Sequence, residues 1–163
     1  MTVKHLTASA LVWSPHGDDW RLCLIEHPLQ HLLLPPGGHL EPNENTEQAV
    51  LREIREESGL EVDLLPPPGT PVLDDLPGAA AVAAPWWISE HPIERDNHLA
   101  APHLHVDHLY VAVARSPEPV TPPEHPAGWY AADRWPALEM AEDTRRLATA
   151  TLPFLARHPP ATG

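Results

Sequence analysis

The chain has 163 residues, the length of one domain. Its 42% hydrophobic and 20% charged residues are typical of a globular protein and exclude an intrinsically disordered one. Lys and Arg number 10 against 23 Asp and Glu, and this net charge of −13 argues against a nucleic-acid polymer as partner. The single cysteine, Cys23, excludes a disulfide within the chain and indicates a reducing compartment. The longest apolar stretch, residues 78–88, is too short to span a membrane. We therefore expect a cytoplasmic protein with no membrane partner.

The first half of the chain predicts a hairpin and then a helix. Residues 6–13 and 20–26 are rich in apolar residues and flank a His-Gly-Asp-Asp turn, so they are predicted to pair as strands. The helix is predicted over Thr46–Ser58, because Asn45 and Gln48 have the spacing of a capping box. A glycine at position 59 follows as a C-terminal stop.

The second half predicts further strands and a terminal helix. Strands are expected at residues 61–65, 79–89, 103–114 and 128–131, with a loop over 91–102 and a helix over 138–157. Strands thus lie on both sides of the central helix in the sequence, which favours a mixed α/β fold with a sheet packed between helices. We expect residues 1–157 to form one domain and residues 158–163 to be a flexible tail.

Three carboxylates of the predicted central helix share one face. At 100° per residue, Glu53, Glu56 and Glu57 lie within about 100° of one another, while Val50 and Ile54 belong to a separate apolar stripe. Like charges at these spacings repel, and a hard divalent cation such as Mg²⁺ would remove that penalty. A solvated acidic helix face would show the same pattern, and the carboxylates alone leave both interpretations open.

The residues around this helix form a longer pattern. A glycine pair at positions 37 and 38 precedes the helix, where it lets the backbone approach a ligand closely. From Gly38 the chain reads Gly-x5-Glu-x7-Arg-Glu-U-x-Glu-Glu-x-Gly-U, in which U is a bulky aliphatic residue. All seven fixed positions and both aliphatic positions of the Nudix box are present, so residues 38–60 resemble a complete box.

The resemblance implies a Nudix-type α/β/α sandwich with a mixed central sheet. It also implies an enzyme, a pyrophosphohydrolase that uses Mg²⁺ or Mn²⁺ to hydrolyse a nucleoside diphosphate linked to another moiety. Only 37 residues precede the box, which favours a nucleoside triphosphate or small nucleotide derivative over ADP-ribose or a nucleotide sugar. The resemblance is also compatible with a non-catalytic nucleotide-binding regulator and with an isoprenoid diphosphate isomerase. A homodimer is left open.

The same resemblance assigns roles to residues of the box. Glu53, Arg52 and Glu57 match catalytic positions of the family. The metal ligands implied are the Gly37 carbonyl, Glu53, Glu56 and Glu57, and supporting positions are Gly38 and Glu44. In elementary terms, cations neutralise a diphosphate and acidify a water, and a carboxylate takes its proton.

Candidate binding residues also lie outside the box. His103, His105 and Asp107 alternate along a predicted strand and so share one face, where they bind metal or phosphate or form a hydrogen-bonded polar patch. Together with the upstream His-Pro-Ile segment they resemble a bacterial Nudix subgroup. Many of its members carry an acid shortly before the first histidine, where residues 100–102 of this chain are Ala-Ala-Pro.

Two further side chains are candidates for substrate binding. His39 directly follows the glycine pair, and Trp129 could stack on a base at the rim of a pocket. With 12 histidines in the chain, an isolated histidine such as His5 is expected to lie on the surface.

Overall fold

The computed structural model describes residues 2–28, 31–71 and 76–157, and eight strands of this part of the chain form one mixed sheet. The strands are β1 Lys4–His16, β2 Asp19–Glu26, β3 Leu33–Leu34, β4 Gly37–His39, β5 Val62–Leu65, β6 Trp87–Ile93, β7 His103–Ala114 and β8 Ala127–Ala131. The helices are α1 Thr46–Ser58, the 3₁₀ helix η1 Ala132–Ala137 and α2 Glu142–Leu155. None of the described helices is long and apolar enough to cross a membrane.

Strands β1 and β7 form the centre of the sheet. They pair in parallel over ten residue pairs, with His5 opposite His105 and Thr7 opposite Asp107. The strand order is β3-β2-β1-β7-β5, and β4, β6 and β8 pair with β1, β7 and β2. A parallel central pair is covered on both faces, which explains why these two strands are apolar at successive positions rather than at alternate ones.

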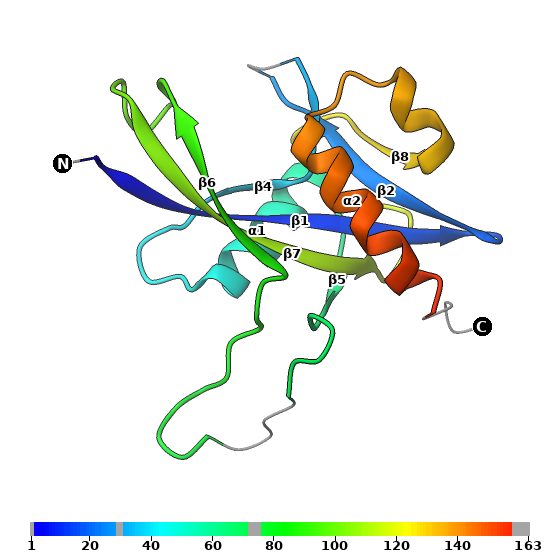
Figure 1. Cartoon of the computed structure of the whole chain (residues 1–163), viewed down its shortest axis with the longest axis horizontal. Coiled ribbons are helices and arrows are strands. Elements are labelled where there is room, and N and C mark those ends of the chain that lie inside the picture. The colour runs from blue at the N-terminus through cyan, green and yellow to red at the C-terminus, as the bar shows by residue number, and fades with distance from the viewer. Residues whose placement is uncertain (1, 29–30, 72–75, 158–163) are drawn as a thin grey trace.

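The two helices cover opposite faces of this sheet (Figure 1). Even-numbered residues of the central strands, such as Ala10 and Tyr110, pack with Ile54 of α1. Odd-numbered residues, such as Leu11, pack with Leu155 of α2. Side chains of a strand alternate between faces, so each position on β1 and β7 belongs to one helix layer.

The structure confirms the predicted central helix and both of its ends. Helix α1 begins after Asn45, whose side chain accepts from the amide of Gln48 while the Gln48 side chain accepts from the Asn45 amide. Gly59 ends the helix in the left-handed conformation, at φ 73°. This φ explains the glycine, because residues with a Cβ rarely adopt it.

Three other predictions of elements need correction. The strand expected at residues 79–89 is β6, Trp87–Ile93, so the loop expected at 91–102 begins only after Ile93. The alanines before it favour strands weakly and Pro85 lacks an amide, whereas Pro92 is tolerated because β6 pairs only with β7 and is an edge strand. The terminal helix, expected over 138–157, is shorter: α2 begins only at Glu142 and ends at Leu155, because Leu138 caps the preceding η1 and Met140 forms a bridge to Leu33.

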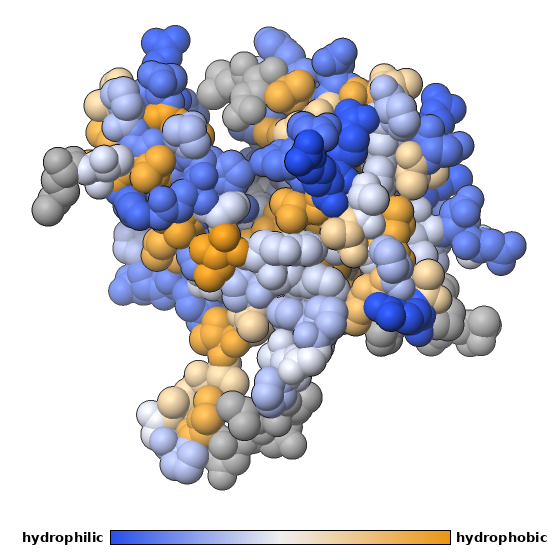
Figure 2. Space-filling view, in the orientation of Figure 1, coloured by the Kyte–Doolittle hydropathy of each residue, from blue (hydrophilic) through white to orange (hydrophobic). Residues whose placement is uncertain are grey.

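Between β5 and β6, the described residues around 66–71 and 76–82 project from the body of the molecule (Figure 1). Figure 2 shows apolar side chains on this projection, where Leu76 and Val82 are exposed. The tail predicted at residues 158–163 lies outside the described residues.

Candidate active site

Helix α1 is fixed to the sheet by its apolar stripe, which leaves its acidic face at the edge of β4. Ala49, Val50 and Ile54 are fully buried in the core. Each box carboxylate therefore projects from a rigid element, the condition for holding a precise charge array.

Arg52 connects the carboxylates of the box. Its Nε and Nη2 donate to the two oxygens of Glu44 at 2.8 and 3.0 Å. Its Nη1 donates to Glu53 at 2.8 Å and to Glu56 at 3.0 Å. Nη2 also reaches the carbonyl of His39 at 3.0 Å, which ties the helix to β4. Because it accepts hydrogen bonds from this guanidinium, Glu44 has a pKa below its ordinary value.

Glu57 lies deeper than the other carboxylates of the helix. Its Oε2 accepts from the amide of Gly37 at 2.8 Å, and its Oε1 lies 3.6 Å from Nε2 of His125. Burial, with smaller contributions from nearby carboxylates that include Glu53, raises the pKa of Glu57 to about 7. A buried carboxylate beside other carboxylates is an environment that favours a bound cation.

The absence of a side chain at Gly38 leaves room for Glu53. A Cβ at this position would lie 2.5 Å from Oε1 of Glu53, which is closer than non-bonded atoms approach. Burial raises the pKa of Glu53. The glycine pair thus opens a space that the Glu53 carboxylate occupies.

These residues fit a hard divalent cation. Glu53, Glu56 and Glu57 supply oxygen donors from one helix face, and Arg52 supplies the only guanidinium that hydrogen-bonds these donors among the described residues. An array with more negative than positive charge and only oxygen donors is suited to Mg²⁺ or Mn²⁺.

A pocket of about 540 Å³ is connected to the buried carboxylate through His125. Its lining includes His125, which faces Glu57, together with Tyr130 and Leu138. Pockets of this size hold molecules of nucleotide size. Trp129, the predicted pocket residue, lines neither this pocket nor the other described one. Its ring packs on the α1 side of the core and its Nε1 donates to the carbonyl of Pro117.

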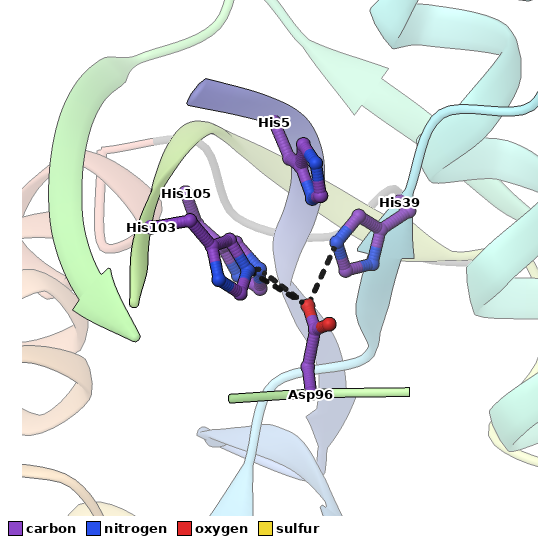
Figure 3. Close-up of side chains that lie close together, drawn as sticks. All are labelled: His5, His39, Asp96, His103 and His105. Carbon is purple, nitrogen blue, oxygen red and sulfur yellow. Dashed lines mark hydrogen bonds and ion pairs between the residues drawn. The ribbon is translucent and has the colours of Figure 1, made fainter. Parts of the chain in front are cut away.

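The histidines predicted as binding residues lie on the α2 side of the sheet, where they form a cluster (Figure 3). His39, His103 and His105 surround one carboxylate oxygen of Asp96, and His5 lies beside them. The predicted common face of His103 and His105 is confirmed. Among the described residues, the cluster is a group of potential metal ligands separate from the box carboxylates of α1. Figure 3 shows all five side chains pointing toward one another.

Asp107 shares this face but takes part in a different network. Its two carboxylate oxygens accept from the hydroxyls of Thr7 at 2.9 Å and Ser9 at 2.6 Å. These hydroxyls come from β1, so Asp107 fastens β7 to β1 between the cluster and the core.

Two members of the cluster were not predicted from the sequence. His5 was expected on the surface, but its Nδ1 is buried beside the other imidazoles. Asp96 supplies the acid that the Ala-Ala-Pro segment lacks, because the loop after β6 turns back toward β7. The sequence held one indication of Asp96, the acid expected shortly before His103. In the structure this acid comes from the loop, seven residues upstream of His103.

Comparison with known proteins identifies the family. The NUDIX domain family model matches residues 3–156, and the chain belongs to this family. A NUDIX-family hydrolase from Clostridium perfringens is 28% identical, with a TM-score of 0.69 over 93% of this chain and 97% of that one. A MutT NUDIX hydrolase from Burkholderia pseudomallei is 25% identical, with a TM-score of 0.58 over 92% and 98%. The Ap4A hydrolase of C. elegans, at 16% identity, TM-score 0.63 and 94% and 100% coverage, shares the fold.

A curated relative matches over a shorter stretch. The "Probable DHNTP pyrophosphohydrolase" of Lactococcus lactis subsp. cremoris (strain MG1363) is 46% identical over 54 residues. This stretch covers 33% of the present chain and 30% of the relative, less than a third of its length. Together with the family match, these comparisons confirm two predictions, the Nudix family and its mixed-sheet α/β fold.

Proposed function

We propose that the protein hydrolyses a phosphoanhydride bond in a nucleoside triphosphate or small nucleotide derivative, with Mg²⁺ or Mn²⁺ as cofactor. The observation that carries the proposal is the carboxylate array of α1, held by Arg52 and set against the glycine pair. The hydrolase relatives agree with this reaction class.

The proposed roles follow from the contacts of each residue. Glu53, Glu56, Glu57 and the Gly37 carbonyl would hold the cation, which when bound neutralises phosphate oxygens and acidifies a water. Glu53 would accept the proton of the attacking water, since Arg52 holds its carboxylate beside the glycine pair and burial raises its pKa, which makes it a stronger base. Arg52 keeps the array in place through five hydrogen bonds.

The pocket beside His125 is the proposed place of the nucleoside. His125 lines this pocket and lies 3.6 Å from Glu57, so a substrate with its diphosphate at the carboxylates would reach the pocket past His125, and Tyr130 in the lining offers a ring for stacking. Loss of a stacking ring costs about 1–3 kcal/mol per base. Tyr130→Ala should therefore raise KM at least five-fold, while Tyr130→Phe, which keeps the ring, should leave KM close to that of the unaltered protein.

The chain's organisation is proposed as predicted. One Nudix domain would comprise residues 1–157, since both helices pack on the same sheet.

A location in the cytoplasm is proposed from Cys23, which is unpaired and buried. Burial raises the pKa of its thiol to about 12. A thiol in this state is protected from oxidation rather than presented for it.

A hydrolysis screen with purified protein tests the proposal. The panel covers canonical and oxidised nucleoside triphosphates, DHNTP, dinucleoside polyphosphates, ADP-ribose and nucleotide sugars, each with Mg²⁺ or Mn²⁺ and with chelator. The matched variants are Glu57→Gln and Glu61→Gln, the latter an exposed carboxylate just beyond the helix that pairs with Arg55.

We expect turnover of a nucleoside triphosphate or small derivative, lost with chelator and reduced at least about 100-fold in Glu57→Gln but not in Glu61→Gln. Activity that persists in Glu57→Gln would contradict the assignment of the site. Preferred turnover of ADP-ribose or a nucleotide sugar would overturn the substrate class. Tight nucleotide binding without turnover across the panel would favour a non-catalytic regulator.

A further inference from the structure

Five potential metal ligands from separate parts of the chain meet on the α2 side of the sheet (Figure 3). They are His5, His39, Asp96, His103 and His105, and their ligand atoms all lie within 4.8 Å of one another. Strands β1, β4 and β7 and the loop after β6 each contribute at least one of them. The cluster is distinct from the box carboxylates, which project from α1 on the other face.

The distances within the cluster match those between the ligands of a small transition-metal ion. Oδ2 of Asp96 lies 2.9 Å from Nε2 of His105, 3.1 Å from that of His103 and 3.2 Å from that of His39. The Nε2 atoms of His103 and His105 are 3.2 Å apart. Ligand atoms about 2.0–2.1 Å from a tetrahedral Zn²⁺ ion are separated by about 3.3 Å.

The hydrogen bonds of His103 indicate which of its nitrogens is free. Its Nδ1 lies 2.8 Å from the carbonyl of Ala101, which can only accept, so Nδ1 carries the proton. In a neutral ring Nε2 then presents a lone pair, and it faces Oδ2 of Asp96, another acceptor. The His103 side chain is 0% exposed, so water does not satisfy its Nε2, and the nearest possible donor is Nε2 of His105 at 3.2 Å, which also faces Oδ2 of Asp96. One proton does not serve both acceptors well, whereas a cation between these atoms would satisfy all three. An Nδ1–H bonded to a carbonyl is also a common support of metal-binding histidines.

Other members of the cluster are oriented in the same way. Oδ1 of Asp96 accepts from the amides of His98 at 2.8 Å and Leu99 at 2.7 Å, which turns Oδ2 toward the imidazoles. Nδ1 of His5 is buried and lacks a hydrogen-bond partner, and the buried Nε2 of His39 makes no hydrogen bond of good geometry, although Oδ2 of Asp96 lies 3.2 Å away. Buried polar atoms without partners are costly in a protein, unless a ligand satisfies them.

We propose that His39, Asp96, His103 and His105 bind a divalent transition-metal ion of the Zn²⁺ type, with His5 as a fifth ligand. Imidazole nitrogens favour Zn²⁺ and its neighbours, whereas Mg²⁺ requires oxygen donors. Four or five protein ligands leave no open position for substrate, so the ion is structural. It fixes the loop after β6 to β4, and the carbonyl of its ligand His39, which Arg52 binds, links it to the carboxylate array of α1.

Metal content of the full-length protein tests this site separately from hydrolysis. After treatment with chelator, the protein is dialysed against micromolar Zn²⁺ in the presence of millimolar Mg²⁺, and bound zinc is measured by elemental analysis. Loading with Co²⁺ in place of Zn²⁺ reports coordination number through visible absorption. The variants are Asp96→Asn and His105→Ala, with His91→Ala on β6 as the matched histidine control and Glu57→Gln as the box control.

We expect one zinc per chain in the unaltered protein and in both controls, and strong absorption of four- or five-coordinate Co²⁺. Asp96→Asn and His105→Ala should bind zinc at least ten-fold more weakly, with a circular dichroism spectrum that shows a retained fold. A folded, unaltered protein that binds no zinc, or zinc equally retained by the two cluster variants, would overturn the site. Loss of zinc in Glu57→Gln alone would place the ion in the box instead. The Co²⁺ spectrum needs no variant and remains decisive if a cluster variant unfolds.

Discussion

The main-chain amide of Gly37 donates a hydrogen bond to Oε2 of Glu57 at 2.8 Å. This bond joins β4 to the last turn of α1 and orients the deepest carboxylate of the site. The glycine pair therefore positions a functional side chain through its backbone and, at Gly38, leaves space for another.

Replacing Gly38 by alanine should lower the hydrolytic activity without unfolding the protein. The new Cβ would meet Oε1 of Glu53 at 2.5 Å, and the atom it meets is the end of a flexible side chain, so the carboxylate moves rather than the backbone. We expect hydrolysis to fall at least ten-fold with little change in the free energy of unfolding. Kinetics and thermal unfolding of Gly38→Ala measure both. A variant that unfolds at much lower temperature, or one with full activity, would show that the Glu53 carboxylate is not what the glycine accommodates.

Arg52→Lys tests whether geometry or charge matters in the array. Lysine keeps the positive charge, but it cannot bond both oxygens of Glu44 and also reach Glu53 and Glu56. We expect the divalent-metal concentration needed for half-maximal activity to rise and kcat to fall at least ten-fold. The matched control is Arg55→Lys, because Arg55 makes one exposed ion pair, with Glu61. Equal activity of the two variants would contradict a positioning role for Arg52.

Local signals made the central helix and the box predictable. Asn45, Gln48 and Gly59 determine the ends of α1 within a few residues of sequence, and the box carboxylates share one helix. Arrangements within one helix follow from its periodicity alone. The family resemblance then supplied the fold, which the order of the predicted strands and helices could only narrow to a mixed α/β class.

The histidine cluster depended on contacts that no local pattern contains. His5 reaches His105 through the parallel register of β1 and β7, a hundred positions apart. Asp96 joins them from a loop whose path depends on its hydrogen bonds to His98 and Leu99. Strand β4 was missed for a related reason, since three residues with a glycine pair form a strand only because β1 is there to pair with them.

The capping box of α1 gives a test of stability without an effect on chemistry. Asn45 accepts from the Gln48 amide at 2.9 Å, and its loss leaves a helix donor unpaired. Asn45→Ala should lower the free energy of unfolding by about 1 kcal/mol, whereas Asn45→Asp should keep most of it. Chemical denaturation measures the difference. Activity per folded molecule should be unchanged, and a loss equal to that of a box variant would mean that the N-cap also shapes the site.

The raised pKa of Glu57 predicts how stability of the metal-free protein depends on pH. Its ordinary value is 4.5 and burial raises the pKa to about 7, so between these values the folded state binds more protons than the unfolded one. Stability then falls as pH rises through this window, by up to about 3 kcal/mol. Histidines such as His39, with a pKa lowered to about 4 by burial and neighbouring imidazoles, act in the opposite direction. The contribution of Glu57 is therefore read as the difference between the unaltered protein and Glu57→Gln.

Unfolding in chelator, followed at several pH values from 4.5 to 8, measures that difference. Relative to Glu57→Gln, the unaltered protein should lose stability steadily toward pH 8. Added Mg²⁺ should restore the stability of the unaltered protein above pH 7, since the cation compensates the buried charge, but should act weakly on the variant. Parallel stability curves for the two proteins would show that Glu57 ionises as freely when folded as when unfolded, and that its burial is not what prepares the site for a cation.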